Sequence, residues 1–157
     1  MKIGLDSSVL VASVKRLGEK FHAPSLGLSK SIGEGGHEGV CSALVLTEVP
    51  GALASTKMPL DKVYEAEASV LAGFRVRVRP FEQYVDDALD LMLEFRELKR
   101  RLDINSADFH HIATAEGEGC DLFVTTDERH LLREDIVHAF SSRIAVRHPA
   151  AALGMLQ

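Results

Sequence analysis

Tryptophan is absent from the sequence, and cysteine and the other aromatic residues are scarce. The 157 residues include two cysteines, and Phe, Trp and Tyr together make up 6% of the chain. Cys41 and Cys120 lie far apart and form no CxxC pair, so we predict two buried free thiols and no disulfide framework. With so few aromatic side chains, the core must consist mainly of Val, Leu, Ile and Ala. Such a composition is typical of helices packed on a buried sheet.

An excess of positive charge is also missing. The chain has 18 Lys and Arg against 23 Asp and Glu, which gives a formal net charge of -5. Broad electrostatic attraction to nucleic acids or anionic membranes rests on a positive surface field. The charge balance argues against such binding, so a role on nucleic acid would need local help such as bound cations.

Long apolar runs are absent as well. No uninterrupted run approaches the roughly 20 residues that a membrane-spanning helix needs. Asp6 also interrupts the N-terminal stretch where a signal peptide would be apolar. We therefore predict a cytoplasmic protein that does not enter membranes. The chain is 46% hydrophobic, enough for a sizeable core, and its length predicts a single domain over residues 1–157.

Short apolar runs alternate with longer periodic segments along the chain. The short runs at residues 2–5, 40–41, 121–125 and 143–146 predict strands, and "FRVRVRPF" predicts a further strand near a sheet edge. The predicted helices follow the first strand and cover about residues 23–32, 43–54, 61–72, 82–101, 105–117 and a short stretch after residue 127. This alternation predicts an α/β fold with three α/β/α layers around a central, mostly parallel sheet.

The carboxylates can be sorted by their place relative to the strands. In open parallel sheets, ligands gather beyond the carboxyl ends of the strands. Asp6 and Asp127 each follow a predicted strand and should lie at that edge, whereas Asp121 precedes its strand and should lie at the opposite edge. Glu48 and Asp108 stand on predicted helices. They can approach the edge where Asp6 lies if their helices pack there.

Several of these residues also have a purely structural interpretation. Asp108 fits a capping box with Asn105, and Asp127 can simply favour a helix N-terminus. Thr125 with Glu128 is itself a capping-box pattern. If the four acids do converge, they would repel one another unless a cation neutralised them. Ligands that are all oxygen suit Mg²⁺ or Mn²⁺.

Three segments, in this order, carry a resemblance to a known family. The segments "IGLDSSVLVAS", "SALVLTEV" and "SADFHHIATAEGEGCDLFVTTDERHL" resemble the PIN-domain ribonucleases, and among them the VapC-like toxins of prokaryotic toxin-antitoxin pairs. The resemblance implies a PIN-like fold and a ribonuclease in which one or two Mg²⁺ or Mn²⁺ ions activate a water. It also implies an RNA substrate, a possible antitoxin partner and a homodimer. The family's catalytic, metal-binding acids fall on Asp6, Glu48, Asp108 and Asp127.

Other parts of the site follow from the same resemblance. Four hydroxyl residues would orient the carboxylates: Ser7, Ser8, Thr125 and Thr126. The family commonly has Asn at the position of Ser8, and the Gly-rich segment of residues 15–39 also departs from its pattern. A basic rim that could contact RNA has these candidates: Arg96, Lys99, Arg100, Arg101 and Arg129.

Some of these residues have competing interpretations. Lys99 and its two basic neighbours also suit the negative end of a helix dipole. His110 and His111 are adjacent, so on a helix they point to different faces and are not expected to share a zinc ion. We expect surface positions for them, or a role in supporting the acids.

Two other function classes remain open at this level. A phosphatase of the haloacid-dehalogenase type also has a nucleophilic Asp after its first strand, but it needs a second Asp where this chain has Ser8. A PIN-like module that only binds a partner is the other alternative, although such a module has no need for four converging acids.

Overall fold

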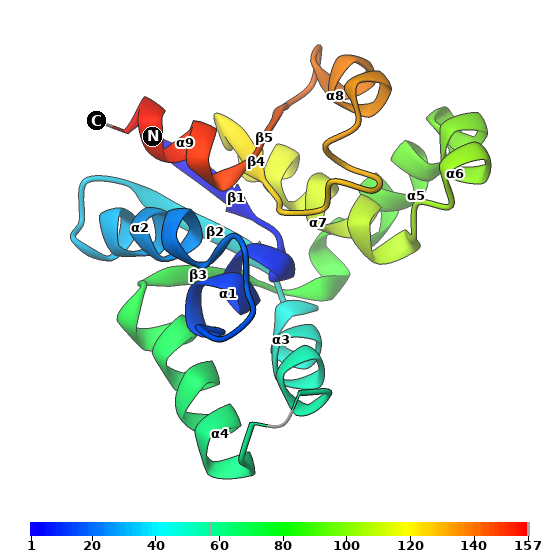
Figure 1. Cartoon of the computed structure of the whole chain (residues 1–157). Coiled ribbons are helices and arrows are strands. Elements are labelled where there is room, and N and C mark those ends of the chain that lie inside the picture. Colours follow the sequence, from blue (N-terminus) through cyan, green and yellow to red (C-terminus); the bar gives the residue numbers. More distant parts are fainter. Residues whose placement is uncertain (57, 157) are drawn as a thin grey trace.

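The computed structural model describes residues 1–56 and 58–156, with Leu71 described by its backbone alone, and these residues form a parallel sheet with helices on both faces (Figure 1). The five strands of this sheet stand in the order β3-β2-β1-β4-β5, and every neighbouring pair is parallel. They are β1 (Lys2–Leu5), β2 (Glu38–Ser42), β3 (Val76–Arg79), β4 (Leu122–Val124) and β5 (Ala145–Arg147). The predicted three-layer α/β/α fold is confirmed, and "FRVRVRPF" does supply an edge strand.

Two apolar cores fill the space between the sheet and the helices. The first lies under α1 (Ser7–Val14), α2 (His22–Gly33), α3 (Val45–Ala54), α4 (Leu60–Ala68) and α9 (Pro149–Met155). The second lies under α5 (Val85–Glu94), α6 (Arg96–Leu102), α7 (Ser106–Gly117) and α8 (Glu134–Phe140). Successive residues of a strand point into opposite cores, as Leu122 and Phe123 do. Within residues 1–56 and 58–156, none of the helices is long and apolar enough to cross a bilayer.

Two helix predictions are wrong in their limits, and a third is wrong in the type of its last turn. The single helix expected over residues 82–101 is a 3₁₀ turn (Phe81–Tyr84) followed by α5 and α6. The break falls at Phe95, which leaves the helical conformation (φ -99°, ψ 23°) and packs its ring 4.6 Å from that of Phe140. The helix expected over residues 61–72 ends as an α-helix at Ala68 and continues as a π-helical turn (Ser69–Gly73). The helix expected directly after residue 127 begins only at Glu134.

The cysteine prediction holds in part. Cys41 is buried in the first core as a free thiol, and burial raises its pKa to about 12. Cys120 is also a free thiol, but it is only partly buried, because it stands in the turn between α7 and β4.

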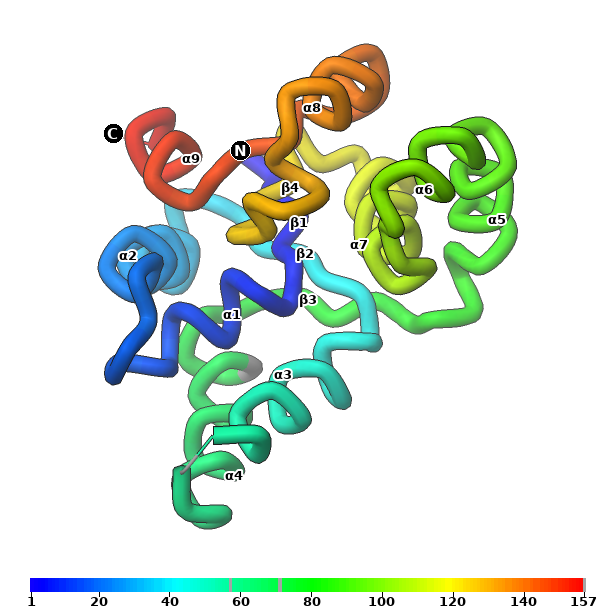
Figure 2. Tube along the Cα trace, turned by 45° about the vertical axis from the view of Figure 1, so that its right-hand side comes forward, coloured from blue at the N-terminus to red at the C-terminus, as the bar shows by residue number. Residues whose placement is uncertain are grey.

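The register of the central strands decides where the site can form. Leu5 of β1 pairs with Val124 of β4, so the two residues that follow them leave the sheet side by side. The backbone N–H of Asp6 donates to the carbonyl of Val124 at 3.0 Å, and that of Thr125 donates to the carbonyl of Arg147 at 3.1 Å. Figure 2 shows β1 and β4 in the middle of the sheet, with α1 on one side and α7 on the other.

Gly4 lets α7 lie close against β1. A Cβ atom on Gly4 would stand 2.4 Å from the Cβ of Ala115 on α7, and 3.2 Å from Cδ2 of Phe123. Contacts this short do not occur between real carbon atoms, so the approach of the helix requires glycine here. The close packing brings the N-terminal half of α7 to the carboxyl end of the sheet.

Candidate metal centre

Asp6 is buried at the end of β1, where hydroxyl groups hold its side chain. The residue is 5% exposed. Its Oδ2 accepts hydrogen bonds from Ser8 Oγ at 2.6 Å and from Thr125 Oγ1 at 2.7 Å, while Ser7 Oγ lies 3.5 Å from Oδ1. Neutral donors of this kind fix the orientation of a carboxylate without cancelling its charge. Oδ2 is thus committed to the protein, whereas Oδ1 has only the longer contact.

The loop after β4 is tied to Asp6 through the same hydroxyls. The N–H of Asp127 donates to Thr125 Oγ1 at 3.0 Å, and the N–H of Thr126 donates to Ser8 Oγ at 3.1 Å. Each hydroxyl therefore accepts from the loop backbone and donates to the acid. Thr126 contributes its backbone here, while Thr125 brings its hydroxyl to the carboxylate. The capping-box interpretation of Thr125 is wrong, because the chain makes turns after it and no helix begins there.

Glu48 reaches the same region from α3 and is held by His111 of α7. His111 Nε2 lies 2.7 Å from Glu48 Oε2 and 4.0 Å from Asp6 Oδ1. The hydrogen bond from His111 lowers the pKa of Glu48, against the effect of burial. Burial alone would lower the pKa of His111, but the bond to Glu48 and the charge of Asp6 raise it. These three side chains thus form one electrostatic group across α3, α7 and β1.

Asp108 stands in the first turn of α7, where it caps the helix and also lies near Asp6. It completes the capping box, because Asn105 Oδ1 accepts from the N–H of Asp108 at 2.9 Å and Asp108 Oδ2 accepts from the N–H of Asn105 at 3.1 Å. It is also 9% exposed, and burial together with the charge of Asp6 raises its pKa to about 6. A capping role alone would not place Asp108 within the field of another buried acid.

Asp127 is the outermost of the four acids. Its Oδ1 accepts from the N–H groups of Arg129 and His130 at 2.9 and 3.1 Å, and its Oδ2 lies 2.9 Å from His130 Nδ1. Its negative charge contributes to the raised pKa of Asp108. Asp127 therefore faces the group, but its oxygens are engaged by its own loop. These are the bonds that a helix N-cap residue makes, but the chain after Asp127 makes turns, and the next helix begins only at Glu134.

Positive charge is lacking around these acids. Among residues 1–56 and 58–156, only His111 and His130 form ion-pair contacts with any of the four predicted acids, and no Lys or Arg does. Elsewhere the chain supplies such partners: burial would raise the pKa of Glu118, but hydrogen bonds from Tyr84 and Lys2 lower it to about 2. Uncompensated buried carboxylates are costly, and a bound cation would remove this cost.

The donor set fits a hard divalent cation. Carboxylate and hydroxyl oxygens surround the group, and Mg²⁺ and Mn²⁺ prefer such ligands. In the part of the chain that the structure describes, no group of three or more His, Cys, Asp or Glu side chains is arranged as it stands to hold a metal ion. The carboxylates would therefore have to close around an ion. The rotatable side chain of Glu48 and the open Oδ1 of Asp6 allow such a closure.

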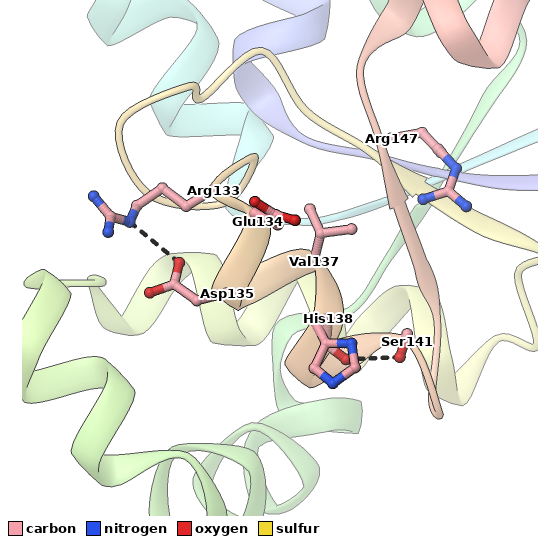
Figure 3. A pocket seen from close by; sticks show the side chains of 7 residues that line it. All are labelled: Arg133, Glu134, Asp135, Val137, His138, Ser141 and Arg147. Atoms are coloured by element: carbon pink, nitrogen blue, oxygen red, sulfur yellow. Dashed lines mark hydrogen bonds and ion pairs between the residues drawn. The ribbon is translucent and has the colours of Figure 1, made fainter.

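A hollow of about 520 Å³ gives access to this group. It lies between α1, α3 and the loop after β4, and it is lined by Ser7, Ser8, Val11, Glu19, Glu48, Gly51, Ala52 and Thr126. A larger groove of about 810 Å³ lies between α8 and β5 and contains none of the predicted acids (Figure 3). Arg133 pairs there with Asp135 at 3.3 Å, and Arg147 donates to the carbonyl of Val146. Of these two hollows, only the smaller one is lined by a predicted acid, Glu48.

The basic residues predicted to contact RNA do not all have free side chains. Three of them have these partners: Lys99 donates to the carbonyl of Ile104, Arg100 pairs with Glu97, and Arg101 pairs with Asp135. Arg96 on α6 and Arg129 in the loop after β4 are exposed. A contact of this rim with RNA stays a prediction.

The adjacent histidines are buried, so the expectation of surface positions is wrong, whereas the alternative of a role in supporting the acids stays a prediction, which the contact of His111 with Glu48 favours. His110 is 4% exposed and His111 is 2% exposed. They point to different partners, as predicted: His110 Nε2 donates to the carbonyl of Phe81 at 2.8 Å, and its Nδ1 accepts from Ser42 Oγ at 2.9 Å. His111 instead faces Glu48. Helical periodicity separates two adjacent side chains but does not name the partner across from each, so the contact with Glu48 was not predicted.

The comparison with known families agrees with this geometry. Residues 3–134 match the family model described as PIN domain, which is most of the chain and includes all four predicted acids. No curated protein sequence matches the chain significantly. PIN domains are typically metal-dependent nucleases, which are hydrolases. The parallel sheet, the acids gathered at its carboxyl edge and this match together identify the chain as a member of the PIN domain family.

Proposed function

We propose that the chain is an endoribonuclease that uses Mg²⁺ or Mn²⁺ to hydrolyse RNA phosphodiester bonds. Asp6, Glu48, Asp108 and Asp127 are the proposed metal-binding, catalytic acids. The observation that carries the proposal is the set of buried Asp6 and Asp108 with half-buried Glu48, which lines a hollow, and among the described residues no Lys or Arg pairs with these acids. Such a group is unfavourable by itself and favourable around a divalent cation.

The proposed roles of the acids differ because neighbouring side chains hold each acid differently. Asp6 is held rigidly through Oδ2 and offers Oδ1, and Glu48 is held through Oε2. A bound divalent cation would lower the pKa of a water and neutralise charge on the phosphate under attack. Asp108, whose pKa is about 6 without a cation, would stay ionised in its presence. Hydrolysis in this family implies a 5′-phosphate and a 3′-hydroxyl as products.

The proposed reaction is tested with a labelled RNA pool and the purified protein. Cleavage is expected with Mg²⁺ or Mn²⁺ and not with a chelator, and Asp6→Asn should lower the rate by at least about 100-fold because it removes a proposed metal ligand. Asp121→Asn is the matched control, since Asp121 accepts from the N–H of Lys2 at the opposite edge of the sheet. Cleavage that persists in chelator, or in Asp6→Asn, would contradict the proposal.

We further propose that this ribonuclease is the toxin of a toxin-antitoxin pair and acts as a homodimer. The support is the resemblance of the "SADFHHIATAEGEGCDLFVTTDERHL" segment to the VapC-like toxins. Expression of the wild-type chain in a bacterial host should arrest growth, whereas Asp6→Asn should permit it at equal protein level. Equal growth of the two strains, with active enzyme in the lysate, would argue against the toxin role. Sedimentation of the purified chain would test the dimer.

A further inference from the structure

His111 occupies a place where an apolar side chain would be expected. It lies on α7 between the buried residues Phe109 and Ile112 and is 2% exposed. An imidazole in such surroundings is costly unless its polar atoms are hydrogen-bonded. An aliphatic residue would pack here without that cost, so the presence of a histidine calls for a specific partner.

The partner of His111 is Glu48. A carboxylate oxygen can only accept a hydrogen bond, so the proton of the 2.7 Å contact resides on His111 Nε2. The other ring nitrogen, Nδ1, is buried and has no hydrogen-bond partner among the described residues. The ring therefore makes its one hydrogen bond to Glu48. His110 differs, because both of its nitrogens are engaged by Ser42 and Phe81.

This contact limits the conformations that the Glu48 side chain can adopt. The Glu48 side chain is 33% exposed and has several rotatable bonds, so without a partner it would sample solvent. The bond to His111 holds Oε2 beside a ring nitrogen that also lies 4.0 Å from Asp6 Oδ1, while Glu48 lines the hollow. Because Nε2 carries the proton of this bond, Nε2 is not free to ligate a metal.

We infer that His111 is a positioning residue that holds Glu48 at the acid group. The inference rests on the proposed metal-dependent function and names a part of its site that the four acids do not include. His111 acts through Glu48 and does not touch the substrate. Outer partners of metal ligands commonly change metal affinity by about 10- to 100-fold when they are removed.

The test is the affinity of the metal-free protein for Mn²⁺, measured by titration calorimetry. His111→Leu removes the donor and keeps an apolar side chain in the core, and it should weaken Mn²⁺ binding about tenfold or more. His111→Gln keeps an N–H donor and should retain the affinity within about threefold. In a Glu48→Gln background, His111→Leu should have no further effect on Mn²⁺ binding, because the side chain it acts through is already changed.

Ile112→Val is the matched control. It loosens the same buried part of α7 without touching an acid, so it should lower the melting temperature and leave the Mn²⁺ affinity unchanged. Wild-type affinity in His111→Leu, or equal losses in His111→Leu and His111→Gln that also appear in Ile112→Val, would overturn the positioning role. Absence of Mn²⁺ binding by the wild-type chain would be a different result, because it would overturn the proposed function and this inference with it.

Discussion

Replacing Asp108 with Asn should abolish metal-supported cleavage of RNA while making the metal-free protein more stable. Burial and the charge of Asp6 raise the pKa of Asp108 to about 6, above its ordinary value of 3.8. The folded protein therefore binds this proton more tightly than the unfolded chain. The contribution of Asp108 to the stability of the metal-free protein is greatest below about pH 4 and is lost as the pH rises through 6. Asn carries no charge and can still accept from the N–H of Asn105.

The expected gain from Asp108→Asn at pH 8 is on the order of 2–3 kcal/mol of unfolding free energy in chelator, and at pH 4 it should nearly vanish. Urea titrations of both proteins at the two pH values measure this difference. The same substitution should lower the rate of RNA cleavage at least about 100-fold. A variant that is less stable than wild type in chelator at pH 8, or that cleaves RNA normally, would show that Asp108 is only a helix cap.

A large loss of stability is expected from the substitution Gly4→Ala. The added Cβ would stand 2.4 Å from the Cβ of Ala115, and neither atom can rotate away, so α7 must shift from β1. Overpacking of this kind costs about 1–3 kcal/mol of unfolding free energy. Since α7 carries both Asp108 and His111, the shift should also weaken Mn²⁺ binding.

Gly51→Ala provides the comparison for Gly4→Ala. Gly51 lies within α3, and a Cβ there would meet no atom within 4 Å. Alanine favours helix more than glycine, so this change should be neutral or stabilise the protein by up to about 1 kcal/mol. Denaturant midpoints of the two variants measure the contrast. Equal stability of Gly4→Ala and the wild type would mean that α7 does not lie as close to β1 as described.

The residues at the carboxyl edge of the sheet could be predicted, because all strands of a parallel sheet end at the same edge. Asp6 and Asp127, which follow two predicted strands, therefore had to lie there once the strands paired. The structure pairs Leu5 with Val124 and meets this condition. Asp108 could be assigned to the same edge because its capping position places it at the start of a helix that packs on the sheet.

Other structural features depend on contacts between distant parts of the chain, and the spacing of apolar residues in the sequence does not predict such contacts. Phe95 continues the apolar spacing of the helix before it, yet its ring packs near Phe140 and the helix breaks there. Asp127 was placed correctly after β4, but the loop that it organises with His130 replaces the expected helix start. A role of the histidines in supporting the acids could be expected, but Glu48 could not be named as the partner of His111, because it lies on α3, 63 residues away in sequence.

The most direct test of the central claim is anomalous diffraction from crystals of the wild-type protein grown with Mn²⁺. We expect a manganese peak at the carboxyl edge of the sheet, with oxygens of Asp6 and Asp108 as ligands and Glu48 beside them. A peak elsewhere on the molecule, or no peak at a Mn²⁺ concentration that supports RNA cleavage, would contradict it.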